Sequence, residues 1–175
     1  MRTLPLAALL LLFGIGCGKQ IGDACGLASD CSPNGDRQCD RASPQGYCTI
    51  QGCDHSSCPD EAACIKFFTG GFSNRPCDPA TEDNPDLSPD DPEPARRPTD
   101  ACSLDELCAF TGTCVPRSSE VRFCMRTCDT DGDCRSGYEC RDLAKMKAHG
   151  GEPVLAPGVR QVDEHAPKFC AAAPK

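Results

Sequence analysis

The chain has 175 residues and a formal net charge of −8, and 17 of its residues are cysteines. An acidic chain with a sequence pI near 4.8 lacks the basic surface that nucleic acid requires, so no nucleic-acid partner is expected. Cysteine at this density in a short chain is typical of exported proteins, where thiols can oxidise. We therefore expect a small disulfide-rich fold with little regular secondary structure, held by bridges rather than by a large core.

Residues 1–16 are predicted to be a signal peptide. Arg2 gives a basic start, and an apolar run broken only by Pro5 extends from Leu4 to Phe13. This run is shorter than the roughly 20 residues that a transmembrane helix needs. Small residues follow it, as at a cleavage site, so the segment fits an export signal.

The segment Phe13-Gly14-Ile15-Gly16-Cys17 resembles the lipobox of bacterial lipoproteins, with Gly14 where that family usually has Leu. The resemblance implies cleavage before Cys17, lipid on its sulfur and acylation of its amino group. Gly18, rather than Asp, then implies an outer-membrane or cell-surface location, with the membrane as a partner. Removing Cys17 also leaves sixteen cysteines, an even number that allows eight bridges. The alternative is an ordinary secretory signal, with Cys17 in a bridge.

The remaining cysteines fall into two sets of eight with similar gaps, so we expect a duplicated module with four bridges in each copy. Residues 17–24 would be the lipidated N-terminus and tether, 25–77 module 1, and 101–175 module 2. The spacing leaves the bridge partners open. The first set is Cys25, Cys31, Cys39, Cys48, Cys53, Cys58, Cys64 and Cys77, and the second is Cys102, Cys108, Cys114, Cys124, Cys128, Cys134, Cys140 and Cys170.

Residues 78–100 separate the two sets and contain six prolines, eight acidic residues and two arginines. Such a segment buries little apolar surface and favours extended conformations. We interpret it as a flexible to semi-rigid acidic linker, with an acidic partner-binding patch as the alternative.

Regular secondary structure is expected to be short. Turn-forming residues punctuate the chain, which contains 16 glycines and 16 prolines. Glycines 150 and 151 should end the longest predicted helix, and a surface excursion over 153–168 should be pinned by Cys170. The expected strands are Tyr47–Gln51, Ala63–Phe68 and Val121–Thr127, and the expected helical segments are Pro59–Cys64, Ser103–Phe110 and Leu143–Ala148.

The cysteines do not have the spacing of a metal or redox site. Zinc, iron–sulfur and thioredoxin-type sites use closely spaced pairs, and the chain contains no Cys-x2-Cys. Calcium is the better candidate, because Asp129, Asp131 and Asp133 place carboxylates at alternating positions. The alternative is a turn in which the same carboxylates accept backbone hydrogen bonds.

Hydrolase and phosphate-binding motifs are absent from the sequence, so we expect a protein that is not an enzyme and has no catalytic residues or cofactor. The segment Cys128-x5-Cys134-x5-Cys140 resembles part of the cysteine-rich lipoproteins of myxobacterial type, which implies the same style of protein but no activity. Its spacing is also similar to part of a whey-acidic four-disulfide core, a protease-inhibitor module, although Arg141 stands where that family has a further cysteine.

The sequence thus predicts an exported, lipid-anchored cell-envelope protein that acts as a non-enzymatic binding or structural module toward an unidentified protein or cell-envelope partner. The alternatives are a secreted protease inhibitor, with the loop Leu155–Lys168 as its inhibitory segment, and a calcium-dependent adhesion module.

Overall fold

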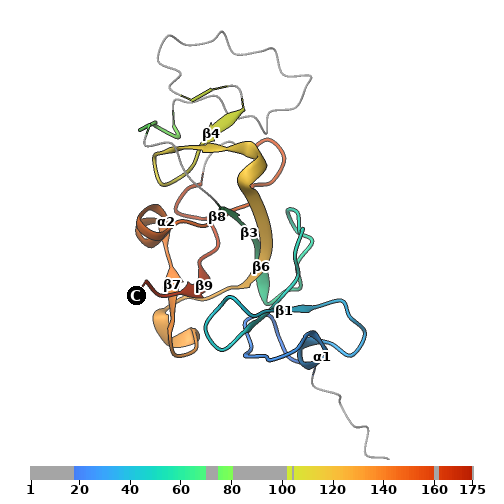
Figure 1. Cartoon of the computed structure of the whole chain (residues 1–175). Helices are drawn as coiled ribbons and strands as arrows, with labels where there is room; N and C mark the ends of the chain where they lie inside the picture. Colours follow the sequence, from blue (N-terminus) through green and yellow to red (C-terminus); the bar gives the residue numbers. More distant parts are fainter. Residues whose placement is uncertain (1–17, 70–74, 81–101, 104, 160–161, 175) are drawn as a thin grey trace, which may run out of the picture.

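A computed structural model describes residues 18–69, 75–80, 102–103, 105–159 and 162–174, and regular elements within them are short (Figure 1). The signal peptide, Cys17 and most of the 78–100 linker therefore lie outside the described residues. The elements are α1 (Ala28–Cys31), β1 (Gln38–Asp40), β2 (Tyr47–Thr49), β3 (Ala62–Phe68), β4 (Glu106–Cys108), β5 (Cys114–Pro116), η1 (Arg117–Ser119), β6 (Glu120–Arg126), η2 (Asp131–Asp133), β7 (Tyr138–Arg141), α2 (Leu143–His149), β8 (Glu152–Pro153) and β9 (Phe169–Ala172).

The longest strands, β3 and β6, form the centre of the molecule (Figure 1). They pair antiparallel over seven residues, from Ala62 opposite Arg126 to Phe68 opposite Glu120. The short strand β8 pairs with the other edge of β3. Because β3 precedes the acidic linker and β6 follows it, this sheet joins the two cysteine sets.

Three further antiparallel pairs, β1–β2, β4–β5 and β7–β9, surround this sheet. In each of these strand pairs, and in β3–β6, a cysteine on one strand lies directly opposite a cysteine on the other. The facing residues are Cys39 and Cys48, Cys64 and Cys124, Cys108 and Cys114, and Cys140 and Cys170.

Facing cysteines do not bond to each other. Each facing cysteine bonds instead to a cysteine that precedes the strand pair in the chain. Each of these strand pairs therefore has a group of four cysteines, in which the first bonds to the third and the second to the fourth. We call these groups units 1 to 4. Their bridges are Cys25–Cys39 and Cys31–Cys48 in unit 1, Cys53–Cys64 and Cys58–Cys124 in unit 2, Cys77–Cys108 and Cys102–Cys114 in unit 3, and Cys128–Cys140 and Cys134–Cys170 in unit 4.

The small disulfide-rich fold expected from composition is confirmed, but the expectation of four bridges within each set of eight is wrong. Two bridges, Cys58–Cys124 and Cys77–Cys108, join the first set to the second. The physical reason is strand pairing, since β6 of the second set lies beside β3 of the first and brings Cys124 to unit 2. Unit 3 is inserted in the chain between the two strands of unit 2.

The apolar core is small and draws on both cysteine sets. Its fully buried side chains include Ile21, Ile65, Met146 and Phe169, packed around bridged cysteines. A second, smaller cluster of Leu107, Ala109 and Val115 lies under the β4–β5 pair, with Phe68 against it. Cores of this size stabilise weakly, so the eight bridges, each typically about 2–4 kcal/mol, are the main source of stability.

Two tyrosines connect unit 1 to unit 4. The Tyr47 ring stacks on Tyr138 at 5.3 Å, and the Arg135 guanidinium lies 4.0 Å from the Tyr138 ring centre. The Tyr47 hydroxyl donates to the Cys170 carbonyl and accepts from the Arg126 N–H. Burial raises the pKa of Tyr47 to about 12, so this hydroxyl stays protonated and can donate its hydrogen bond at any physiological pH.

The predicted strands are confirmed as β2, β3 and β6, and the predicted helix over residues 143–148 is confirmed as α2. That helix is capped before its first residue by Asp142, whose carboxylate accepts the Lys145 N–H, and after its last residue by Gly150, with φ of 80°. The helical turns expected over 59–64 and 103–110 are wrong, because strands begin at Ala62 and Glu106. In each case, pairing with a distant strand overrides the local helix signal.

Candidate functional site

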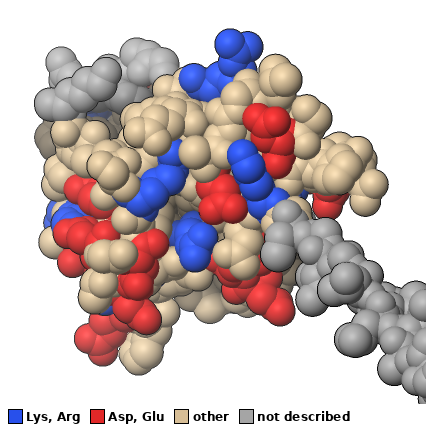
Figure 2. All heavy atoms as spheres, turned by 90° about the horizontal axis from the view of Figure 1, so that it is seen from below, with Lys and Arg blue, Asp and Glu red and all other residues tan. Residues whose placement is uncertain are grey.

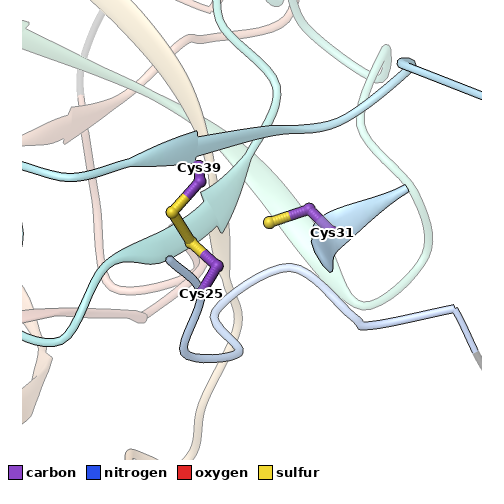
Figure 3. A group of neighbouring side chains, drawn as sticks. All are labelled: Cys25, Cys31 and Cys39. Atoms are coloured by element: carbon purple, nitrogen blue, oxygen red, sulfur yellow. A yellow bond between two sulfur atoms is a disulfide. The ribbon is translucent and has the colours of Figure 1, made fainter. Parts of the chain in front are cut away.

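The sulfur atoms of each unit gather closely. In every unit, three of the four sulfurs lie within 4.8 Å of one another, as they would around a soft metal ion. Figure 3 shows this arrangement in unit 1, where Cys31 points toward the bridge between Cys25 and Cys39. Each of these sulfurs is in a disulfide, whereas a metal ligand must be a thiolate. The clusters are therefore paired bridges that close each unit.

The acidic loop predicted as a calcium site contains the 3-10 turn η2. The Asp133 carboxylate accepts the backbone N–H groups of Thr130 and Asp129 at 2.8 and 3.0 Å, and also the Thr130 hydroxyl. Hydrogen bonds from the Thr130 N–H and then the Asp129 N–H hold the pKa of Asp133 below its usual value. Asp133 thus acts as a cap for its own turn.

Asp131 is already paired with a cation. Its two oxygens lie 2.6 and 2.9 Å from the Lys145 ammonium group on α2, and one of them accepts the Cys140 N–H at 2.7 Å. The hydrogen bond from Lys145 lowers the pKa of Asp131 and raises that of Lys145. Asp129 contributes its backbone carbonyl, which accepts from Lys168 at 3.3 Å. The geometry is that of the turn alternative, and calcium binding stays a prediction.

An apolar hollow of about 360 Å³ lies between the β4–β5 pair, the end of β3 and the C-terminal end of α2. Aromatic and small side chains make up most of its wall. This volume is at the lower end of the range in which small-molecule sites fall. Its lining residues are Phe67, Phe68, Ala109, Phe110, Thr111, Thr113, Val115, Met146, Ala148, His149, Gly150, Gly151 and Glu152.

Glu152 is the buried charge of this hollow and is only 6 % exposed. Its carboxylate lies 3.3 Å from the Lys66 ammonium group and accepts the Phe110 N–H at 2.8 Å. Burial raises the pKa of Glu152, and the positive charge of Lys66 opposes that rise. Because Phe110 belongs to the loop that joins β4 to β5, this carboxylate ties unit 3 to the central sheet.

His149 stands at the rim of the hollow and is held by a second charged group. Its Nδ1 lies 2.7 Å from Glu139, which also accepts from Arg141 at 3.0 Å. The buried Arg141 guanidinium donates to the carbonyls of His149 and Gly150, at the negative end of α2. The rim is therefore held at several points by contacts within the protein.

The predicted inhibitory loop, Leu155–Lys168, covers a second hollow of about 410 Å³, although residues 160–161 lie outside the described part. The loop is attached to the body at Val162, which packs on the core, and at Lys168, whose carbonyl accepts the Cys128 N–H. Val159 is 48 % exposed near its middle.

Sequence reasoning did not identify Glu152, Lys66 or Arg141. Glu152 and Lys66 face each other only because β8 pairs with β3, and no local motif signals that contact. Comparisons of the chain with known protein families, with curated proteins and with solved structures found no match. Among the described residues, no helix is long and apolar enough to cross a membrane.

Proposed function

We propose that this protein is exported and anchored to the cell envelope by lipid on Cys17, and that it acts there as a non-enzymatic binding module. The observation that carries the proposal is the pairing of the cysteines. All sixteen cysteines of the described residues form bridges with one another. Of the 17 cysteines, Cys17 is therefore left without a partner in its own chain, which supports the lipobox resemblance.

The start of the described chain supports the same proposal. Ile21, only four residues after Cys17, is completely buried, and the Gly22 N–H donates to the Cys48 carbonyl at 2.9 Å. Cleavage before Cys17 would therefore leave every described residue, including this buried contact, in the mature chain. The eight bridges also require an oxidising compartment outside the cytosol.

The apolar hollow beside α2 supports a binding rather than a catalytic role. Its wall is mostly apolar, and its buried carboxylate, Glu152, is used within the protein to hold Lys66 and the Phe110 N–H. The hollow suits an apolar group of modest size, and its rim, held by contacts within the protein, would bind without rearrangement.

The anchor is tested by intact mass spectrometry of the protein extracted from membranes. We expect a chain that starts at Cys17, carries an acyl mass increment and has sixteen oxidised cysteines. The Cys17→Ser variant should keep all eight bridges but lose the acyl mass and the membrane association. A membrane-free wild-type chain without acyl mass, or one with Cys17 in a disulfide, would overturn the proposal.

Binding in the hollow is tested with the fluorescent apolar probe 8-anilinonaphthalene-1-sulfonate. Ala148→Trp places a large ring on the wall of the hollow, so the probe should bind more weakly than to the wild type. Ala144→Trp, at an exposed position of the same helix that does not line the hollow, is the matched control. Equal probe fluorescence in the two variants would count against the hollow as a binding site.

A further inference from the structure

The link between Cys17 and the folded part is very short. The Gln20 N–H donates to the Asp23 carboxylate at 2.9 Å, and the Lys19 ammonium group donates to the Ala24 carbonyl at 2.7 Å. The chain is thus fixed from Lys19 onward, and Ile21 is fully buried. Even a fully extended backbone spans at most about 3.6 Å per residue, so the Cα atom of Cys17 lies within about 14 Å of that of Ile21.

A short tether decides which part of the molecule lies nearest the bilayer. The described chain starts beside α1, at the end of the molecule opposite the β4 strand (Figure 1). An anchored protein on a long tether could tumble freely, but a tether of this length keeps the α1 end at the lipid headgroups.

This end carries an exposed apolar side chain. Leu27, just before α1, is 62 % exposed and is the more exposed of the two large hydrophobic side chains on the surface of the described residues. The Asp30 carboxylate accepts the N–H groups of Gly26 and Leu27, at 2.8 and 3.0 Å, and fixes the backbone there. Leu27 is thus held outward at the end of the molecule where the lipid would be.

The charges around α1 indicate what kind of lipid surface this end of the molecule can contact. Figure 2 views the molecule from this end and shows Lys and Arg interspersed with Asp and Glu, with no broad field of one sign. Such a surface is neither drawn to anionic lipid by charge nor repelled by it. Contact with the bilayer would come from the anchor and from burial of Leu27 in the interface.

We propose that the α1 end of the protein, which carries the exposed Leu27, lies against the lipid bilayer, and that unit 3 with the apolar hollow points away from it. This inference rests on the proposed lipidation of Cys17. It gives the protein one orientation, in which the hollow faces the space beyond the membrane and stays open to a partner.

The chain contains no tryptophan, so one introduced Trp reports on its own surroundings. We would purify the lipidated full-length Leu27→Trp variant and place it in phosphatidylcholine vesicles with and without bromine on the acyl chains. Thr111→Trp, on the exposed turn between β4 and β5, is the matched control from the opposite end. Retention on vesicles would not be informative, because two acyl chains suffice for stable anchoring.

The expected result is strong bromine quenching for Leu27→Trp and none for Thr111→Trp; emission wavelength is not compared, because Thr111 lines the apolar hollow. Absence of quenching at Leu27→Trp, or equal quenching at both positions, in protein whose mass shows the acyl groups, would overturn the inference while leaving the anchor in place. Absence of the acyl mass would instead refute the proposed function, and the inference would fall with it.

Discussion

Removal of the Cys58–Cys124 bridge, by replacing both cysteines with alanine, should lower the free energy of unfolding by about 4 kcal/mol. A bridge restricts the unfolded chain, and the effect grows with the loop that it closes. The two cysteines are 66 residues apart, but Cys77–Cys108 takes 31 residues out of that loop, which leaves about 35 residues. Cys53–Cys64 closes only 11 residues, so the matched double variant should lose about 3 kcal/mol.

Denaturation of the oxidised proteins in guanidinium chloride measures these losses. A covalent assay tests the same pairing directly: a specific protease site is placed in the 81–100 segment, and the cut protein is run on a gel without reductant. The halves should stay joined through the two crossing bridges and separate only on reduction. Halves that separate without reductant, or a larger loss for the Cys53–Cys64 variant, would refute the pairing.

Three smaller changes test individual contacts. At Gly46, the methyl group of an alanine would lie 2.0 Å from a backbone carbonyl oxygen, whereas Gly35 has the same left-handed backbone but open space around it. Gly46→Ala should therefore lower the unfolding midpoint in denaturant far more than Gly35→Ala. Equal shifts would contradict the close packing around Gly46. Glu152→Ala should cost about 1–3 kcal/mol in chemical denaturation, because the Phe110 N–H loses its acceptor and Lys66 loses one of its partners, and Glu152→Gln should cost less; a neutral Glu152→Ala would refute a structural role for these contacts. The folded state lowers the pKa of Asp131 from 3.8, so its contribution is present above that pH and lost as pH falls through the folded pKa. The difference in Tm between wild type and Asp131→Asn should accordingly shrink on acidification, and the ion pair with Lys145 predicts no calorimetric heat on calcium addition, whereas saturable heat that Asp131→Asn abolishes would establish the calcium site.

Local secondary structure could be predicted from sequence where the signal is carried by neighbouring residues. The segments that form β3 and β6 each contain several apolar residues, and the helix over 143–149 ended where two glycines follow it. The helical turn predicted at Ser103 shows the limit. The Ser103 N–H does donate to the Glu106 carboxylate, as in a capping box, but β5 pairs with residues 106–108 and makes them a strand.

The bridge pattern could not be read from spacing. Comparison of gaps grouped the cysteines by eights along the chain, whereas bridging follows strand register. Cys64 and Cys124 face each other on paired strands although all of unit 3 lies between them in the sequence. No local sequence feature indicates that pairing. The same holds for the hollow, whose buried carboxylate meets its lysine only after β8 joins the sheet.

The insertion of unit 3 within unit 2 has a consequence for biogenesis. A chain that enters an oxidising compartment N-terminus first can close unit 1 at once, but Cys58 must wait 66 residues for Cys124. During that delay its thiolate can attack neighbouring disulfides and form non-native pairs. Because every unit joins alternate cysteines, an oxidase that paired them in order of emergence would form non-native bridges, and reaching the native pairing would then require disulfide exchange.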